Sequence, residues 1–536
     1  MKFIRSAEMK ELEKAADAAG FSYAAMMESA GKGIASAIHH RFVQTKDAMV
    51  LGLVGGGNNG GDTLIALSQL QQQGWSTRAI LVMDRSSTDP LILNFLSSGG
   101  SILDVDQALK LEDNEHLLFL DGVFGTGFHP PLPEKLQLLF AQLRKKYPAA
   151  QWIAVDCPSG IDCETGEVSP GTLKASLTIC LEAVKRGMLT YTAFPYCGEL
   201  MTVDLGISQY GSFSHSKENI VADPELVREI LPERSDFAHK GSFGKVMIIG
   251  GSINYPGAPV LAGRGAYSVG VGLVQVAIPE SIAQNSAAST PELTWLILPD
   301  AGGIISEMAS DTITPAWQTA QSLVIGPGMA REETTRRFLE NLLSGKKERK
   351  SKAGFPGVSG KKLDGEDNPI LSPVVVDADG LYLISRQDRW WQVLPSETIL
   401  TPHPGEMAML SGLSIAEIQE NRLDVAKDFA AKWQVFLVLK GALTVVADPE
   451  GRLAVIPIAS SSLAKAGSGD VLAGMIGGLL AQRVPAWKAA IAGAWLHAQA
   501  GKVAARHAGC AESILASDLI RSVPEVIATL KTNDLH

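Results

Sequence analysis

Short apolar runs alternate with amphipathic stretches along almost all of the 536 residues. In the first half these runs lie at 48–54, 79–83, 116–127, 151–160 and 176–187. In the second half they lie at 244–252, 271–279, 322–329, 373–380, 397–406 and 435–448. Continuous apolar strands separated by helices are typical of a parallel sheet that is covered on both faces. The pattern predicts an α/β protein whose ligands bind beyond the carboxyl ends of the strands.

The chain is too long for one ordinary core, so two or more domains are expected. Between residues 206 and 235 the sequence loses strand character and gains polar residues. This change predicts a domain boundary near residue 220. The two halves share no repeat that can be aligned, which indicates two different folds joined in one chain. We expect one domain over residues 1–218 and another over 226–530.

One stretch of the second half, residues 344–368, carries seven Lys or Arg residues and four acidic residues. Little in it could enter a core, so it reads as a solvated and flexible insertion without a function of its own. We expect its deletion to change the free energy of unfolding little, because lengthening or shortening a surface loop has a small entropic effect. Loss of activity in the deletion variant would instead place the segment in a site or an interface.

Charge and cysteine usage narrow the class of protein. The formal net charge is −10, which argues against nucleic acid as the main partner because phosphate binding needs a basic surface. Five cysteines without metal-ligand spacing indicate reduced thiols. The first residues form a charged helix rather than a signal peptide, and no apolar run reaches the roughly 18 residues of a membrane span. We expect a soluble cytoplasmic protein, a homo-oligomer, that binds small molecules and no membrane.

The loop at residues 51–63, LGLVGGGNNGGDT, joins an apolar strand to a helix through five glycines. A glycine turn at a helix N-terminus can bind an anion, because free N–H groups and the helix dipole face the ligand. Gly55, Gly57 and Gly60 fit the dinucleotide fingerprint, and Asp84 ends the next apolar run, so a nicotinamide dehydrogenase is one alternative. The paired amides that follow, at 58 and 59, favour a metal ion or sugar hydroxyls as ligands.

Two further strands of the first half end in aspartate. Asp121 precedes a glycine-bearing loop, and Asp156 precedes Cys157-Pro158-Ser159-Gly160. Each could be only a turn or cap residue. Together with the glycine loop they predict a ring of carboxylates and amides, formed by Asn58, Asn59, Asp62, Asp121 and Asp156. Oxygen ligands from Asn59, Asp121 and Ser159 would suit a potassium-like cation.

The segments GGGNNGGD, DGVFGTGF and VDCPSGIDCETG resemble the motifs of NAD(P)H-hydrate epimerases, and MMESAGKGIA (26–35) is similar to the N-terminal helix of that family. The resemblance runs through most of residues 1–215 and implies a Rossmann-like, three-layer α/β/α domain. It also implies K+ binding by Asn59, Asp121 and Ser159. The residues implied in binding the hydrated nucleotide are Asn58, Asn59, Gly60, Gly61, Asp62, Gly125, Thr126, Gly127, Phe128, His129, Pro130, Pro131 and Asp156.

Epimerising a hydrate at the carbon that bears the hydroxyl can proceed by ring opening or by loss and return of water. Either route needs a group that moves a proton. Asp156, at a strand end beside the glycine loop, is our candidate for this catalytic group. Lys185 and Asp162 are the alternatives.

A second glycine turn, Gly467-Ser468-Gly469-Asp470, begins a helix in the second half. Its backbone N–H groups would form an anion hole, and Asp470 would lie beside a bound phosphate. Lys440 stands at another strand end, TPHPGE (401–406) supplies a histidine and a glutamate, and IGPG (325–328) is a further glycine turn. An acidic residue in the first turn of a helix is also common for stability alone.

These segments resemble the ribokinase-like fold and, within it, the ADP-dependent NAD(P)H-hydrate dehydratases, over about residues 230–525. The resemblance implies Asp470 as the catalytic base, with ADP and Mg2+. It implies hydrate binding by Gly328, His403, Pro404, Gly405, Glu406, Met407, Ala408, Met409 and Asp470. It implies ADP binding by Lys440, Gly441, Ala442, Leu443, Thr444, Ser460, Ser461, Ser462, Leu463, Ala464, Lys465, Ala466, Gly467, Ser468 and Gly469. The turn departs from the family, which usually has threonine where Ser468 stands, so we expect an altered nucleotide affinity.

Taken together, the two resemblances imply a bifunctional enzyme that repairs hydrated NADH and NADPH. One domain would interconvert the R and S hydrates, and the other would dehydrate the S form at the expense of ADP. Two alternatives belong to other classes. One is a ribokinase-like kinase of a small vitamin precursor, fused to a nucleotide-binding domain. The other is a protein that binds nucleotides without turnover.

Overall fold

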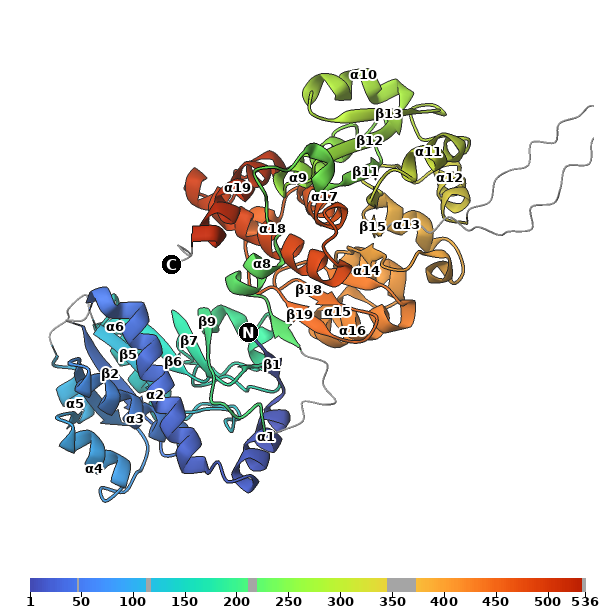
Figure 1. The fold of residues 1–536 in the computed structure, drawn as a ribbon. Helices are drawn as coiled ribbons and strands as arrows, with labels where there is room; N and C mark the ends of the chain where they lie inside the picture. Colours follow the sequence, from blue (N-terminus) through green and yellow to red (C-terminus); the bar gives the residue numbers. More distant parts are fainter. Residues whose placement is uncertain (46–47, 112–116, 211–218, 345–372, 533–536) are drawn as a thin grey trace, which may run out of the picture. The chain divides into compact units, whose positions relative to one another are not determined.

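A computed structural model of the protein describes residues 1–45, 48–111, 117–210, 219–344 and 373–532. The chain divides into two compact units, Met1–Val221 and Ala222–His536, coloured blue to green and green to red in Figure 1. Except for Ser344, the segment that we predict to be an insertion, residues 344–368, lies outside the described residues. No helix in the described part of the chain is both long and apolar enough to span a membrane.

A seven-stranded sheet forms the centre of the first unit, in the order β4-β3-β2-β5-β6-β7-β9. All of its neighbouring strands are parallel. Its strands are β2 (Met49–Val54), β3 (Ser76–Leu81), β4 (Ser101–Leu103), β5 (Leu117–Gly122), β6 (Gln151–Val155), β7 (Leu177–Leu181) and β9 (Glu199–Val203). The short strands of this unit are β1 (Phe3–Ile4), which pairs with β8 (Val184–Lys185), and β10 (Ile220–Val221).

Helices cover both faces of this sheet, as the continuous apolar strands predict. Along β2, Val50 and Val54 belong to the core under one set of helices, and Leu51 and Leu53 to the core under the other. This alternation follows from the two-residue period of a strand. The first layer contains α1 (Ser6–Ala18), α2 (Tyr23–Phe42), α3 (Asn58–Gln72) and α4 (Pro90–Ser97). The second contains α5 (Val105–Ala108) and α6 (Glu134–Lys146), and α7 (Phe194–Cys197) precedes β9. The predicted three-layer arrangement is confirmed.

The sheet of the second unit runs in the order β19-β18-β17-β16-β15-β14-β11-β12-β13. The strands from β11 to β17 are parallel, whereas β17, β18 and β19 form an antiparallel edge. The strands are β11 (Lys245–Ile249), β12 (Leu273–Pro279), β13 (Thr294–Leu298), β14 (Ser322–Ile325), β15 (Val374–Val376), β16 (Ile399–Leu400), β17 (Phe436–Leu439), β18 (Val445–Ala447) and β19 (Leu453–Val455). The apolar run at 435–448 is thus two strands with a turn at 440–444 between them.

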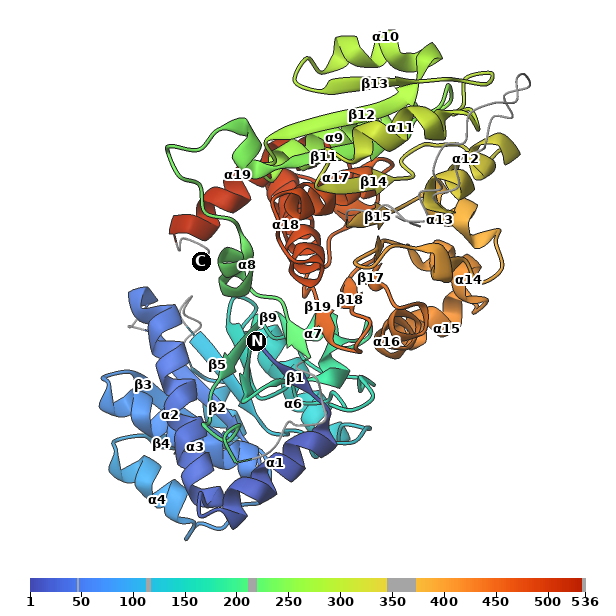
Figure 2. The same ribbon diagram turned by 45° about the vertical axis from the view of Figure 1, so that its right-hand side comes forward.

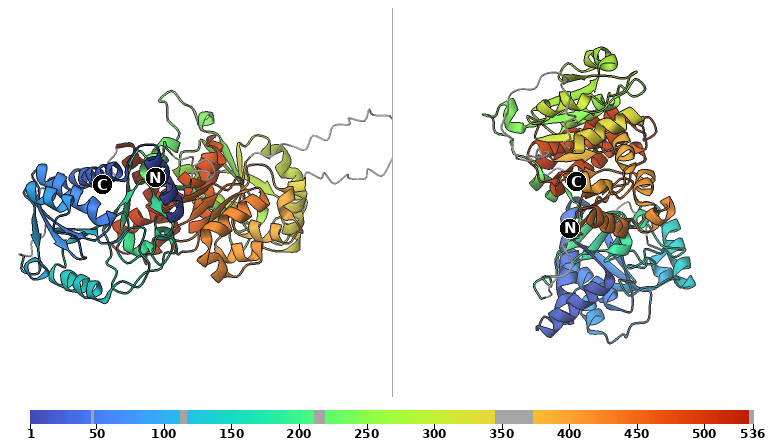
Figure 3. Two further views of the ribbon diagram at one scale, coloured as in Figure 1. Left: turned by 90° about the horizontal axis from the view of Figure 1, so that it is seen from below. Right: turned by 90° about the vertical axis from the view of Figure 1, so that its right-hand side faces the viewer.

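Helices cover both faces of this sheet as well. The helices α9 (Ala258–Ser268), α17 (Ser468–Ala481) and α18 (Ala486–Ala508) pack on one face, with α19 (Ala516–Thr532) behind them. The helices between β13 and β17 lie on the opposite face (Figure 2). These are α11 (Ala309–Trp317), α12 (Glu333–Ser344), α13 (Asp379–Ser385), α14 (Pro404–Ser411), α15 (Ile415–Glu420) and α16 (Arg422–Trp433), while α8 (Pro224–Ile230) and α10 (Glu280–Ser289) complete the unit (Figure 3). The predicted α/β class is confirmed for the second unit as well, since a mainly parallel sheet is covered by helices on both faces.

Candidate active sites

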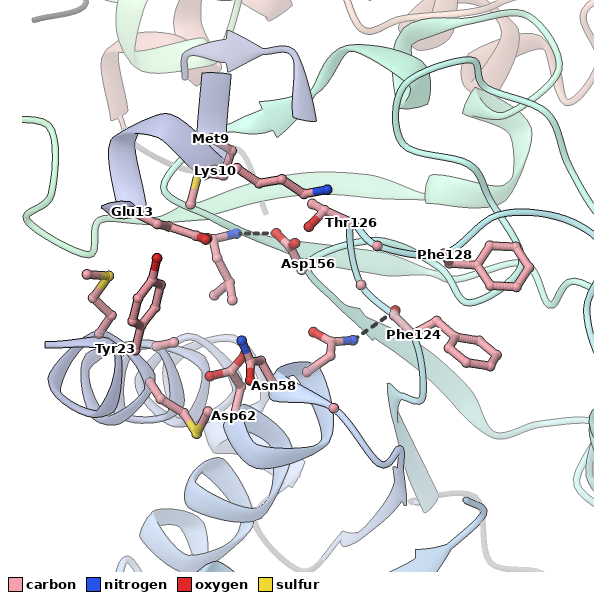
Figure 4. A pocket seen from close by; sticks show the side chains of 18 of the residues that line it. Met9, Lys10, Glu13, Tyr23, Asn58, Asp62, Phe124, Thr126, Phe128 and Asp156 are labelled. Atoms are coloured by element: carbon pink, nitrogen blue, oxygen red, sulfur yellow. Dashed lines mark hydrogen bonds between the residues drawn. The ribbon is translucent and has the colours of Figure 1, made fainter. Parts of the chain in front are cut away.

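A pocket of about 670 Å³ opens at the carboxyl ends of the strands of the first unit. The glycine loop after β2, the start of α3 and the loop after β5 form much of its wall (Figure 4). Glu13 and Lys10 reach it from α1, and Asn58 and Asp62 reach it from α3, with Asp156 at its centre. Carboxyl ends of parallel strands meet at one edge of a sheet, which explains why distant segments converge here.

Asp156 follows β6 directly and adopts a left-handed backbone conformation, φ 65°. One of its carboxylate oxygens accepts hydrogen bonds from the Lys185 ammonium and from the backbone N–H of Leu181, the latter at 3.0 Å. Lys185 is fully buried and also donates to the backbone oxygen of Leu181 at 2.9 Å. Burial lowers the pKa of Lys185, but the charge and the hydrogen bond of Asp156, together with the nearby Cys180 and Cys163, outweigh this effect and raise the pKa above its ordinary value. The ammonium therefore stays charged.

Two more carboxyl groups of the pocket are easily protonated. Burial, followed by the negative charges of Asp156 and Glu13, raises the pKa of Asp62 well above its usual range. Burial and the charge of Asp156 also raise the pKa of Glu13. The pocket thus holds the Asp156–Lys185 ion pair beside two carboxyl groups whose pKa values are raised. Sites that separate the pKa values of neighbouring groups in this way can both remove and supply a proton.

The three predicted cation ligands lie close together around Phe124, and Asn59 also lines this pocket. Ser159 donates its hydroxyl to one oxygen of Asp121 at 2.6 Å and its backbone N–H to the other at 2.9 Å. Asn59 donates its amide N–H to the backbone oxygens of Phe124 at 2.9 Å and Val155 at 3.1 Å. Asp121 is buried among neutral partners, and burial raises the pKa of its carboxyl group. A cation would compensate this buried charge, so the donor set, with a single carboxylate, fits a monovalent ion.

Not every residue that we expect to bind the hydrate faces the pocket. Gly125, Thr126, Gly127 and Phe128 line it, whereas the rest of the loop, His129 to Pro131, does not. Neither Gly60 nor Gly61 lines it, and Gly60 has a packing reason, since a Cβ there would lie 2.0 Å from the backbone oxygen of Gly55.

Asp162, an alternative for the proton transfer, also lies outside the pocket lining. It accepts hydrogen bonds from the backbone N–H groups of Glu164 and Thr165, and it pairs with His129 at 2.8 Å. Lys185, the other alternative, is bound to Asp156 itself.

The second site lies at the carboxyl edge of the other sheet. Gly328 follows β14, Asp377 follows β15, Thr401 follows β16 and Lys440 follows β17. The N-terminus of α17 faces this edge, with Gly467 in the left-handed conformation (φ 86°) as the residue before the helix. Ser468, Gly469 and Asp470 then form the first turn, and backbone N–H groups at such a helix N-terminus favour an anion.

An adjoining pocket of about 380 Å³ contains most of the residues that we expect to bind ADP. It is lined by Lys440, Gly441, Ala442, Thr444, Ser460, Leu463, Ala464, Lys465, Ser468 and Gly469. The remaining predicted residues, Leu443, Ser461, Ser462, Ala466 and Gly467, do not line it. Its other wall is largely apolar and comes from Ile458, Leu472, Ala494, His497 and Ala498. Burial lowers the pKa of His497 to about 4, so its ring is neutral at pH 7.

Charged groups surround Asp470. Burial, followed by the negative charge of Asp377, raises its pKa to about 7, although Lys440 opposes the shift. Lys440 pairs with Asp377 at 2.6 Å and with Glu406 at 3.5 Å. Burial lowers the pKa of Lys440, but these carboxylates outweigh it and raise the pKa. A carboxyl group with a pKa near 7 is suited to act as a general base.

The residues that we expect to bind the hydrate begin α14. His403 caps this helix, accepting the N–H groups of Gly405 at 3.0 Å and Glu406 at 3.2 Å, and Glu406 bonds back to the N–H of His403. Within the helix Met407 is buried and Met409 is 38% exposed. Gly328 has φ 65°, and a Cβ there would lie 2.7 Å from the Cβ of Tyr255.

Sequence reasoning missed several residues that lie in or beside the two sites. Glu13 lies on a helix whose sequence we describe only as charged. Met9 and Glu13 are nevertheless one turn apart and share a face of that helix. Asp377 and Asp379 follow a short strand whose apolar run we interpret as structure alone. The one signal available was that both are acidic residues at a strand end, the same feature that marks Asp121 and Asp156. His497 lies deep in α18 and carries no local signal.

Comparison with known proteins separates the same two parts of the chain. A family model described as YjeF-related protein N-terminus matches residues 23–187. A second, described as NAD(P)H-hydrate dehydratase, matches residues 246–348 and 359–525. A solved structure of the ADP/ATP-dependent NAD(P)H-hydrate dehydratase of Bacillus subtilis, co-crystallised with ATP and Mg2+, is 28% identical. It covers 58% of this chain and 99% of its own, with a TM-score of 0.46.

Relatives match over nearly the full length. The bifunctional NAD(P)H-hydrate repair enzyme Nnr of Moorella thermoacetica is 32% identical over 99% of this chain and 97% of its own length. The enzyme of the same name from Gloeobacter violaceus is 34% identical over 94% of both chains. That from Escherichia coli is 29% identical over 98% of this chain and 93% of its own. These matches do not support the nicotinamide dehydrogenase that the spacing of Gly55, Gly57 and Gly60 left open, and the chain belongs to the family of bifunctional NAD(P)H-hydrate repair enzymes.

Proposed function

We infer that the protein repairs hydrated nicotinamide nucleotides with two activities: the first unit epimerises the R and S hydrates of NADH and NADPH, and the second dehydrates the S hydrate at the expense of ADP. The observation that carries this inference is the match to bifunctional relatives over 99% of the chain. The two pockets at the carboxyl edges of two separate sheets agree with it, because each activity needs a site of its own.

For epimerisation, we propose that Asp156 is the group that moves the proton. Lys185 holds its carboxylate in place from within the core. The hydrate would lie along the wall formed by the glycine loop and by Gly125 to Phe128. Asp62 and Glu13, whose raised pKa values favour the acid form, can return a proton to the substrate.

For dehydration, we propose that Asp470 removes the proton of the substrate hydroxyl, whose oxygen then attacks the terminal phosphorus of ADP and displaces AMP. The phosphate ester leaves with its bonding electrons while the ring nitrogen lone pair forms a C=N bond. Loss of a proton from the neighbouring carbon restores the reduced nicotinamide ring. The N-terminus of α17 would stabilise the charge on the transferred phosphoryl group. The products are NAD(P)H, AMP and phosphate.

Two ions complete the proposal. K+ would bind Asn59, Asp121 and Ser159 and neutralise the buried Asp121 charge. The described residues contain no cluster of three His, Cys, Asp or Glu side chains able to hold a metal. Mg2+ therefore fits best when it is carried by the nucleotide phosphates, where it would neutralise their charge. We further propose domains over residues 1–218 and 226–530, and a homo-oligomer that acts on small molecules in the cytoplasm.

The test is an assay with a mixture of R and S hydrates of NADH, with and without ADP, that follows the absorbance of reduced nicotinamide. We expect complete, ADP-dependent recovery of NADH, since epimerisation supplies the S form from the R form. Recovery of only part of the mixture would contradict the epimerase activity. No recovery with either ADP or ATP would contradict the dehydratase activity and favour the kinase or binding alternatives.

The cation site gives a separate prediction. Replacing Asp121 with Ala should strongly reduce R/S interconversion and abolish its dependence on K+, because the variant removes the single carboxylate of the proposed ligand set. Dehydration of pure S hydrate should be unchanged. The measurement compares both activities in K+ and in a large organic cation. Loss of both activities would show that Asp121 serves the stability of the protein.

A further inference from the structure

Three carboxylates surround one ammonium in the second site, and they do not share it equally. Lys440 Nζ lies 2.6 Å from Asp377 Oδ1 and 3.5 Å from Glu406 Oε2. Among the described residues, no ion pair within 4.0 Å joins Lys440 to Asp470, although the two charges are close enough to influence each other. Of the three carboxylates, Asp470 is therefore the one that forms no direct ion pair with the Lys440 ammonium.

Asp377 is held rigidly. It is 1% exposed, its backbone N–H donates to Ile325 of the neighbouring strand at 3.0 Å, and Thr401 donates its hydroxyl to Asp377 Oδ1 at 2.7 Å. The backbone N–H of Lys440 donates to Pro402 at 2.9 Å, which fixes the other end of the pair.

The Asp377–Lys440 pair also abuts the first turn of α17. A Cβ added to Gly469 would lie 3.4 Å from Lys440 Nζ and 3.7 Å from Asp377 Oδ2. Gly469 directly precedes Asp470. The pair therefore lies beside the base that we propose for dehydration, with its ammonium on the side of the nucleotide pocket, which Lys440 also lines.

We propose that Asp377 is a positioning residue for dehydration: it holds the Lys440 ammonium against itself and keeps it from pairing with Asp470, so that Asp470 remains a free base. This inference rests on the proposed role of Asp470. Its physical reason is that an opposite charge within about 4–6 Å lowers the pKa of a carboxyl group by about 1–3 units, and a base weakened in this way removes a proton less readily.

The other carboxylates around Asp470 also raise its pKa. Burial is the largest cause of its raised pKa, and Asp377, Asp379 and Glu406 add to it, while Lys440 opposes. Asp379 is itself paired with Arg331 at 2.7 Å. The groups that face the site from the surrounding elements are Asp377, Asp379, Arg331, His403, Glu406, Lys440 and His497.

Replacement of Asp377 with Asn releases Lys440 toward Asp470 and removes one repelling charge. The pH at which kcat/KM for the S hydrate rises should then fall by about 1–3 units, with kcat at pH 8 reduced roughly tenfold because the base is weaker. Replacement of Lys440 with Met should shift this rise in kcat/KM to higher pH. If the role of Asp377 were purely structural, its replacement would lower activity without shifting the pH dependence of kcat/KM.

The double variant Asp377→Asn/Lys440→Met tests whether Asp377 acts through Lys440. It removes one charge of each sign, so the net charge of the site is unchanged, and the pH dependence of its kcat/KM should shift less than that of Asp377→Asn alone. Asp448→Asn is the matched control, because Asp448 is also 1% exposed and also pairs with a cation, Arg452, but at the end of β18. The pH dependence of kcat/KM in Asp448→Asn should coincide with that of the wild type.

A titration without turnover separates this inference from the proposed function. In full-length protein labelled at the aspartate carboxyl carbons, the Asp470 signal is identified by its loss in Asp470→Asn, and its pKa is measured by NMR. We expect a lower pKa in Asp377→Asn and a higher one in Lys440→Met. An unchanged Asp470 pKa in Asp377→Asn overturns the inference. Wild-type protein without ADP-dependent dehydration overturns the function of Asp470 instead, whatever the titration shows.

Discussion

Replacement of Asp470 with Asn is expected to lower ADP-dependent dehydration of the S hydrate by about 10²–10⁴-fold, the usual contribution of a general base. The amide keeps the size of the side chain but cannot accept the hydroxyl proton. ADP binding should be nearly unchanged, because the nucleotide pocket is formed by other residues. R/S interconversion should be unaffected, since it belongs to the other unit.

The pH dependence gives an independent signature of Asp470. The base must be ionised, and its pKa is about 7, so kcat/KM of the wild type should rise with pH through about that value. Stability should show the opposite trend. A carboxyl group whose pKa is raised in the folded state contributes stability at low pH that is lost as pH rises through the folded pKa. Asp470→Asn should therefore gain in melting temperature relative to the wild type between pH 4 and pH 8.

Two other properties of the same protein, epimerisation and ADP binding, serve as controls for this variant. Epimerisation by the same preparation reports on the first unit, and ADP binding by calorimetry reports on the fold of the second. A near-normal dehydration rate in Asp470→Asn would remove Asp470 from the mechanism. A loss of ADP binding together with activity would show that the carboxyl group supports the nucleotide pocket rather than proton transfer.

Much of the fold follows from the sequence because continuous apolar runs identify strands that are buried on both faces. The runs at 48–54 and 151–160 contain β2 and β6. The antiparallel edge at β18 and β19 does not follow so directly, because the run at 435–448 gives no sign of where it turns. The structure shows the turn at Gly441 and Leu443, which both have positive φ.

The candidate sites are predicted only in part, because a local sequence pattern marks some of their residues and not others. Asn59, Asp121 and Ser159 each follow or precede a glycine turn at a strand end, and the structure brings them together around Phe124. Glu13 reaches the first pocket, and Asp377 reaches Lys440 beside the second, through tertiary packing alone. A charged residue on an amphipathic helix, or an acidic residue after three valines, has no local pattern that separates a site from a solvated surface or a turn.

Asp156 and Lys185 show why burial matters for the first unit. Lys185 is 0% exposed, so its charge depends on Asp156 as a partner. Removing one member of such a pair leaves a buried charge uncompensated and destabilises a protein by about 3–5 kcal/mol. A simple loss of activity in an Asp156 variant could therefore arise from unfolding of the unit, and the experiment has to separate the two effects.

Replacement of Asp156 with Asn is expected to lower R/S interconversion by about 10²–10⁴-fold, while dehydration of pure S hydrate continues at the wild-type rate. The double variant Asp156→Asn/Lys185→Met removes both charges, so it should recover most of the melting temperature lost by the single variant. It should recover none of the epimerisation, because the proton-moving carboxylate is still absent. The measurement follows exchange between purified R and S hydrates by chromatography, beside a thermal melt of each variant. If the double variant regained epimerisation with its stability, Asp156 would serve only to neutralise Lys185, and the proton would have to move through Asp62 or Glu13, the other carboxyl groups that line the pocket.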